Sequence, residues 1–216
     1  MSSYTEGQTH QLVDRLEDQG FTPGHITKLG QFDNLAGIKS VLDGTAKITP
    51  VAEEDTARVV TINETTIAVN LAATPKLPFD GARVELHIGD GWVVVEKQTD
   101  GLYVGGCKVV LYVSKRQRNN KYIGGHELRE ELTGKPVLNA NVFDALIKNS
   151  HLIPEDWKKD ENGNIRYIFF WATVYSVSYG SLCVRYLFSR DGEWRSDYRW
   201  LDNVWYGFYP AALRAS

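Results

Sequence analysis

The first quarter of the chain carries apolar residues at the spacing of amphipathic helices. Three short helices are predicted here, and they end at Gly20, Gly30 and Gly44. Helices this short are stable only when their apolar faces pack on each other or on the rest of the chain. We therefore predict a short N-terminal helical bundle that occupies residues 1–50.

From residue 57 the pattern changes to alternating apolar and polar positions, which is typical of half-buried strands. Strands are predicted in pairs on either side of short turns: 58–62 and 65–70 around Asn63-Glu64, 82–88 and 92–97 around Gly89-Asp90-Gly91, and 102–104 and 107–114 around Gly105-Gly106. Connections this short join antiparallel neighbours, so we predict a central antiparallel β domain at residues 51–121.

The last predicted domain, residues 122–216, combines helices with further strands. Helical patterns cover 126–132 and 139–149, and strands are predicted at 165–175, 182–188, 194–201 and 204–208. Because the turns between these strands are short, they are expected to form a four-stranded antiparallel meander. The predicted fold class is therefore α+β, with a helical bundle, a central sheet, and a helix plus meander at the C-terminus.

Composition narrows the class of protein only slightly. Hydrophobic residues make up 43% and charged residues 24%, which excludes a disordered or collagen-like chain. The formal net charge of −3 gives no overall attraction to nucleic acid or anionic lipid. Cys107 and Cys183 lie in β-like apolar segments, where each is expected to be a small buried hydrophobe. We see no signal peptide and no bilayer-spanning apolar run, so a cytoplasmic location is expected.

Aromatic residues concentrate near the C-terminus, and more than half of them lie between residues 165 and 209. Because side chains alternate across a strand, Trp194, Tyr198 and Trp200 share one face. Such a face can stack on a sugar ring, a nucleobase or an apolar peptide. The alternative is that these rings belong to the core and are covered by the predicted helix at 139–149.

The segment 22–48 resembles the helix-turn-helix of repressor-type DNA-binding proteins, on the apolar spacing of Ile26 to Gly30 and Ile38 to Ile48. The resemblance implies that the second helix enters the major groove. Residues 1–50 contain more acidic than basic side chains, whereas DNA binding rests on basic groups that contact phosphates. A DNA-binding regulator is therefore the alternative function, and nucleic acid is not the expected partner.

A basic loop precedes the predicted helix at 126–132. Its cations are Lys115, Arg116, Arg118 and Lys121, and Gly124-Gly125 leads from them into the helix. A helix N-terminus beside basic side chains can hold an anion such as phosphate. The alternative is a solvated loop whose charges protect a sheet edge.

Catalytic motifs are missing from the sequence. The histidines are scattered, at His10, His25, His87, His126 and His151, and none has a metal-ligand spacing to another. No nucleophile elbow, Walker loop or dinucleotide fingerprint is present. A pair of Cys107 with His87 or His126, brought together by the fold, would support a hydrolase or transferase. We expect no metal and no cofactor.

Two stretches carry a resemblance to a known group. Glu127 to Val142 reads ELREELTGKPVLNANV and His151 to Trp157 reads HLIPEDW, and the chain ends in Pro210 to Ser216, PAALRAS. These stretches resemble uncharacterised hypothetical proteins of uncultured candidate-phylum bacteria. The resemblance implies a bacterial protein and brings no activity or functional residue with it.

Taken together, these patterns favour a non-enzymatic binding or interaction protein that uses the aromatic face of Trp194, Tyr198 and Trp200. The expected partner is a protein or a small polar ligand, and neither nucleic acid nor a membrane. A homodimer through a sheet edge is expected if the strand at Val204–Phe208 is left open.

Overall fold

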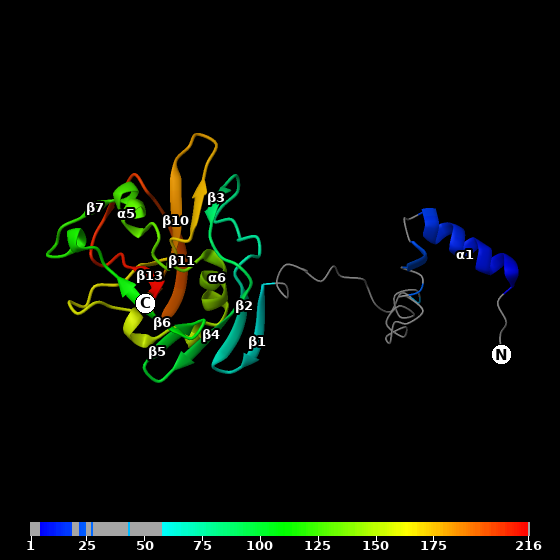
Figure 1. Ribbon diagram of the computed structural model, residues 1–216, viewed down its shortest axis with the longest axis horizontal. Helices are drawn as coiled ribbons and strands as arrows, with labels where there is room; N and C mark the ends of the chain where they lie inside the picture. Colours follow the sequence, from blue (N-terminus) through cyan, green and yellow to red (C-terminus); the bar gives the residue numbers. More distant parts are fainter. Residues whose placement is uncertain (1–4, 19–21, 25–26, 28–42, 44–57, 216) are drawn as a thin grey trace. The chain divides into compact units, whose positions relative to one another are not determined.

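The computed structural model describes residues 5–18, 22–24, 27, 43 and 58–215. The chain divides into two compact units, Met1–Val51 and Ala52–Ser216. In the first unit, helix α1 covers Glu6–Asp18 and confirms the first predicted helix (Figure 1). The other two helices of the predicted bundle fall almost entirely outside the described residues, as does the segment that resembles a helix-turn-helix.

One large sheet forms the framework of the second unit. Its hydrogen-bonded order is β1, β2, β4, β5, β6, β13, β8, β10, β9, β3, and β11 pairs with β10 off this path. The strands are β1 Val59–Asn63, β2 Thr66–Asn70, β3 Arg83–His87, β4 Trp92–Gln98, β5 Gly101–Val104, β6 Cys107–Tyr112, β8 Ile168–Phe169, β9 Thr173–Ser176, β10 Leu182–Arg190, β11 Glu193–Trp200 and β13 Ala211–Arg214. Apart from a parallel contact between β13 and β8, the described pairings are antiparallel. The fold is thus mixed α and β, with strands in the majority.

Two of the three predicted hairpins in the central domain are present. β1 pairs with β2, and β5 pairs with β6 across Gly105-Gly106, whose φ angles of 62° and 75° suit a two-residue turn. The third hairpin, around Gly89-Asp90-Gly91, does not form. β4 is already paired on both edges, with β2 and β5, so β3 pairs with β9 instead.

The C-terminal strands depart from the predicted four-stranded meander. The β10–β11 hairpin forms as predicted, but the segment 165–175 is split into β8 and β9, which both lie along β10. β12, Val204–Trp205, pairs with β7, Ile123–Gly124, and not with β11. The unpredicted strand β13 lies between β6 and β8, so the two domains predicted at 51–121 and 122–216 share one sheet.

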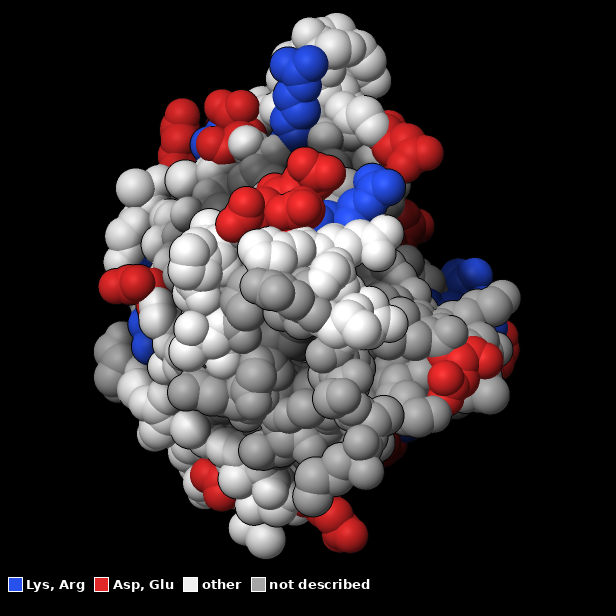
Figure 2. Space-filling view, turned by 90° about the vertical axis from the view of Figure 1, so that its right-hand side faces the viewer, with Lys and Arg blue, Asp and Glu red and all other residues white. Residues whose placement is uncertain are grey.

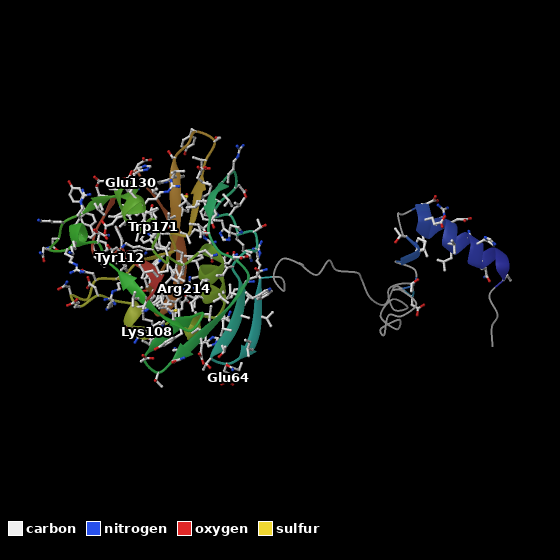
Figure 3. All side chains as sticks on the ribbon, viewed as in Figure 1. Glu64, Lys108, Tyr112, Glu130, Trp171 and Arg214 are labelled. Atoms are coloured by element: carbon white, nitrogen blue, oxygen red, sulfur yellow. The ribbon has the colours of Figure 1, made fainter. Side chains whose placement is uncertain are left out.

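Two helices pack on opposite faces of this sheet (Figure 1). α6, Ala140–Lys148, contacts β2, β10 and β11 and forms the larger core with them. α5, Gly125–Leu132, packs over a second core that contains Trp171, which Figure 3 shows in the interior. Along β10, Leu187 faces the α6 side and Val184 faces the α5 side, as the two-residue alternation of a strand requires.

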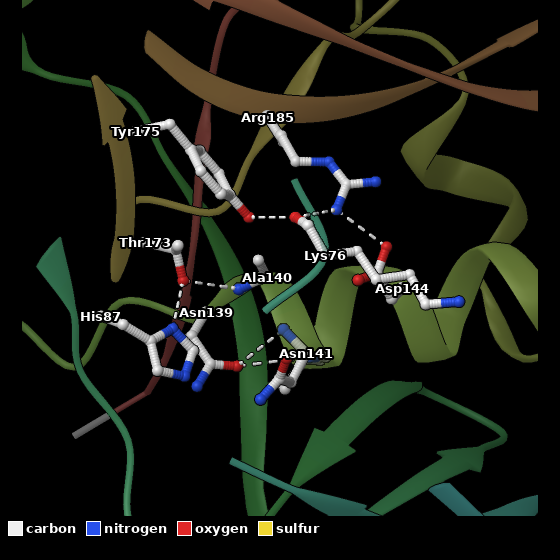
Figure 4. Close-up of polar contacts among 10 residues, drawn as sticks. Lys76, His87, Asn139, Ala140, Asn141, Asp144, Thr173, Tyr175 and Arg185 are labelled. Carbon is white, nitrogen blue, oxygen red and sulfur yellow. Dashed lines mark hydrogen bonds and ion pairs between the residues drawn. The ribbon is translucent and has the colours of Figure 1, made fainter. Parts of the chain in front are cut away.

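A polar network fixes the start of α6 (Figure 4). The side-chain oxygen of Asn139 accepts hydrogen bonds from two amides of the first helical turn, and its NH₂ group donates to the carbonyl of Leu71 at 3.0 Å. That carbonyl also accepts from His87 Nε2 at 2.8 Å. A carbonyl cannot donate, so Nε2 carries a proton, and Nδ1 lies 2.8 Å from the hydroxyl oxygen of Thr173. The predicted Asn139–Asn149 helix is therefore confirmed, with Asn139 as its cap.

Figure 2 shows acidic and basic side chains among the described residues, which belong to two separate units. The formal net charge of the chain is small, at −3.

Candidate functional site

The predicted aromatic face lies on the α6 side of the sheet. Trp194, Tyr198 and Trp200 are all partly buried. Trp194 packs against the α6 core, and the other two pack against a smaller cluster that includes Ala140 of α6. These contacts support the alternative that this face is part of the core.

The rings of this face also differ in orientation. Tyr198 and Trp200 meet edge to face, at 84° between their planes, and Phe79 packs on both, at 4.7 and 5.8 Å between ring centroids. A flat platform for a ligand needs rings that lie in a common plane. That the three residues bind a ligand stays a prediction, and it rests on the part of each side chain that remains exposed.

The basic loop is divided between two environments. Arg116 forms an ion pair with Glu127 at 2.9 Å, and the same carboxylate accepts a hydrogen bond from the amide of Gly124 at the start of α5. These two contacts lower the pKa of Glu127, the backbone hydrogen bond more than the arginine. An internal carboxylate thus occupies the helix N-terminus where an external anion was expected. Lys115 and Lys121 are exposed.

The remaining cation of the loop, Arg118, lines a cavity of about 830 Å³. Three segments surround this cavity, hereafter the polar pocket: the end of β6 with the following turn, the turn at 160–166, and the segment 206–210. Its lining residues are Leu111, Val113, Gln117, Arg118, Asn119, Asn120, Asp160, Glu161, Asn162, Asn164, Arg166, Tyr206, Gly207, Phe208 and Pro210.

Gln117 holds two walls of the polar pocket together. Its side chain is buried, and its amide donates to the carbonyl of Tyr206 at 2.8 Å while its oxygen accepts from the amide of Ser114. Gly207 fits closely against this turn, because a Cβ atom there would lie 3.1 Å from the carbonyl oxygen of Gln117. On the other side, the carbonyl of Phe208 accepts from the amide of Tyr167 at 2.9 Å. The aromatic wall is therefore positioned by backbone contacts on both sides.

A tight turn presents Arg118 to the polar pocket. Asn119 and Asn120 have φ angles of 56° and 59°, and the amide of Lys121 donates to the carbonyl of Arg118. Two successive left-handed residues define a type I′ turn, and asparagine tolerates that conformation better than most residues. Within the described part of the chain, Arg118 has no ion-pair partner, so its charge is available to a ligand.

Two parallel rings form the apolar side of the polar pocket. Tyr206 and Phe208 lie 5.6 Å apart between centroids with only 7° between their planes. Tyr209 packs behind them, against both rings, and Arg199 lies over the ring of Tyr209. The sequence predicted a strand at 204–208, but β12 ends at Trp205, and Gly207 and Phe208 lie in a turn. The pair was therefore missed, because a turn brings the two rings together and strand alternation does not.

The acidic side of the polar pocket is built on a turn. The carboxylate of Asp160 accepts hydrogen bonds from the amides of Asn162 and Asn164 and from the side chain of Asn164. Slight burial raises the pKa of Asp160, but these hydrogen bonds outweigh it, so the pKa lies below its ordinary value. Asp160 is therefore ionised at neutral pH. Asn162-Gly163-Asn164 was predicted only as a turn, because no local pattern indicates that this turn lines a pocket.

No catalytic pair forms among the histidines of the described residues. His87 belongs to the network at the start of α6, and His126 pairs with Asp202 at 3.1 Å on the surface. Neither contacts Cys107 through a described hydrogen bond, and no cluster of metal-ligating side chains occurs in the described ranges. A hydrolase or transferase function stays a prediction without a site to carry it.

The two cysteines are expected to differ sharply in reactivity. Cys183 is fully buried, and burial raises the pKa of its thiol to about 12, whereas Cys107 is partly exposed. Because the thiolate is the nucleophile, iodoacetamide should modify Cys107 alone in the folded protein and both cysteines after denaturation. Mass spectrometry counts the adducts, and Cys107→Ser should leave the folded protein unmodified. An adduct on Cys183 under native conditions would contradict the packing described.

No protein-family model, no curated protein and no solved structure matches the chain. Within the part of the chain that the structure describes, no helix is both long and apolar enough to cross a membrane.

Proposed function

We propose that this is a non-enzymatic binding protein whose ligand occupies the polar pocket. The observation that carries the proposal is a pair of parallel rings, Tyr206 and Phe208, in one cavity with the guanidinium groups of Arg118 and Arg166. Ligand sites combine apolar contact area with a few placed polar groups, and this cavity combines both.

Preorganisation supports the same proposal. The aromatic segment is held by Gln117 and Tyr167, the arginine turn by its own hydrogen bond, and Arg166 donates to the carbonyl of Asp156. Binding groups that are already fixed lose little conformational entropy when a ligand arrives. The aromatic face of β11 offers less contact area to a ligand, because its rings pack at steep angles and are partly covered.

Chemical-shift mapping by NMR tests this proposal. We would add a neutral oligosaccharide, ATP, a mixture of amino acids and an acidic pentapeptide in turn, each at about 5 mM, which detects weak affinities. At least one of these probes should shift the backbone amides at 117–120, 162–166 and 206–208.

Two alanine variants serve as the matched pair for this experiment. Tyr206→Ala should abolish the shifts, and Tyr198→Ala, an aromatic truncation on β11 outside the lining of the pocket, should retain them. The proposal fails if no probe shifts the amides of the pocket, or if the shifts gather around Trp194 and Trp200 and depend on Tyr198.

A further inference from the structure

The charges of the polar pocket are balanced. Arg118 and Arg166 contribute two positive groups, and Asp160 and Glu161 contribute two negative groups. A site for phosphate or carboxylate normally presents cations without competing anions, because an anionic ligand has to lose its hydration shell beside them. The formal balance therefore favours a ligand without net charge.

The negative charge of Asp160 is also fixed in place. Its carboxylate accepts three hydrogen bonds from its own turn, which keep it ionised and hold its position. It consequently cannot take up a proton or swing away to admit an anion without breaking that turn. Arg166, which lies in the same pocket, is held by the carbonyl of Asp156.

Primary amides supply much of the remaining polar surface. Asn119, Asn120 and Asn162 have no described hydrogen bond from their side-chain amides to another described residue. Each amide offers two donors and an oxygen acceptor at once, and a hydroxyl group is likewise both donor and acceptor. A ligand that carries several hydroxyl groups can therefore satisfy these amides and the charged side chains together.

The aromatic pair of the polar pocket, Tyr206 and Phe208, also suits a saccharide. The face of a sugar ring that carries its C–H bonds is apolar and packs on an aromatic face, where the negative quadrupole attracts those hydrogens. On the assumption that the polar pocket is a ligand site, we infer that its ligand is an uncharged saccharide, whose C–H face packs on the stacked pair of Tyr206 and Phe208 and whose hydroxyls bind the asparagines and arginines.

Titrations followed by NMR test the ligand class. The probes are cellotriose, maltotriose and N,N′-diacetylchitobiose as neutral saccharides, and trigalacturonic acid and ATP as anions. At least one neutral saccharide should bind about tenfold or more tightly than either anion. Its affinity should change by less than about twofold between roughly 50 and 500 mM NaCl, because an uncharged ligand has no net Coulomb energy to screen.

Glu161→Gln provides the second measurement, since it removes one exposed negative charge without changing the size of the side chain. The preference for neutral over anionic probes should fall by about threefold or more in this variant. Tighter binding of ATP or trigalacturonic acid at the amides of the pocket would overturn the saccharide assignment and leave the pocket as a binding site. If none of the five probes shifts those amides but the amino acids or the acidic pentapeptide do, the ligand class fails and the binding function stands; if no probe shifts them, both fail.

Discussion

Gly125→Ala is expected to lose at least about 3 kcal/mol of its free energy of unfolding, which is at the upper end for overpacking. A Cβ atom at this position would overlap the carbonyl oxygen of Leu201 and Nε1 of Trp205, and it would lie 2.8 Å from Cα of Leu201. Two of these atoms belong to the backbone and cannot move aside by a change of rotamer. Urea unfolding, with the midpoint and slope compared between variants, measures the loss.

The neighbouring glycine is the matched control. A Cβ atom on Gly124 would approach only the side chain of Glu127, at 3.5 Å, which is ordinary van der Waals contact. Gly124 caps α5, and alanine is a poorer cap, so Gly124→Ala should cost no more than about 1 kcal/mol. Alanine has a higher helix propensity than glycine. Propensity alone would therefore predict that Gly125→Ala raises the free energy of unfolding, the opposite of the effect expected from its packing. Equal stability of the two variants would show that Gly125 does not pack closely on Leu201 and Trp205.

Asp144→Leu is expected to lose about 3–5 kcal/mol, the usual cost of removing one partner from a buried ion pair. Asp144 of α6 pairs with Arg185 of β10 at 2.9 Å, and their side chains are only 14% and 13% exposed (Figure 4). Without the carboxylate, the guanidinium stays buried over the ring of Phe143 with one long hydrogen bond, to the carbonyl of Lys76 at 3.4 Å.

Removing the arginine of the pair should lower the free energy of unfolding less than removing the aspartate does. In Arg185→Leu, the carboxylate of Asp144 keeps the attraction of Arg58 and Lys76 and can also take up a proton. Burial raises the pKa of Asp144 more than these cations lower it, so the folded state binds that proton more readily than the unfolded chain does. Ionisation of Asp144 therefore costs stability as the pH rises above its ordinary pKa of 3.8, and Asp144→Asn should weaken this pH dependence.

The double variant Asp144→Leu/Arg185→Leu completes the cycle. Because the pair contributes little net stability once desolvation is counted, the double variant should be more stable than Asp144→Leu alone. Urea unfolding measures each of the four proteins. A double variant whose loss equals the sum of the two single losses would refute the coupling between α6 and β10.

Local sequence signals predicted the elements better than their partners. The helices at 126–132 and 139–149 and the hairpin at Gly105-Gly106 form almost as predicted, because caps, glycines and periodicity act within a few residues. The pairing of β3 with β9 spans a long stretch of sequence, and no local pattern specifies it. Strand β13 was missed since alanines such as Ala211 and Ala212 are weak strand formers, and burial between β6 and β8 decides their conformation.

The same holds for the candidate site: local signals pointed to some of its residues but not to the residues that they meet. Arg118 was singled out by its charge, whereas Tyr206 and Phe208 were assigned to a strand that ends at Trp205 in the structure. Their meeting with the turn at 160–166 depends on the fold, because residue 118, that turn and residue 206 are distant in sequence. Trp194, Tyr198 and Trp200 drew attention through residue type and strand alternation, which do not tell a binding surface from a covered one.

The expected sheet-edge homodimer stays a prediction. Val204 and Trp205, where an open edge was expected, pair with β7. In the described sheet, β1 and β3 are the strands at the two ends of the hydrogen-bonded order. Analytical ultracentrifugation would decide whether either end pairs with a second copy.

The position of the bound saccharide can be measured by intermolecular nuclear Overhauser effects between its protons and those of the protein. Whichever neutral saccharide binds most tightly should show contacts from its ring C–H protons to the aromatic protons of the Tyr206–Phe208 pair, and these contacts should vanish in Tyr206→Ala. Contacts to the rings of Trp194, Tyr198 or Trp200 instead, or a bound sugar without contact to either aromatic group, would contradict the account.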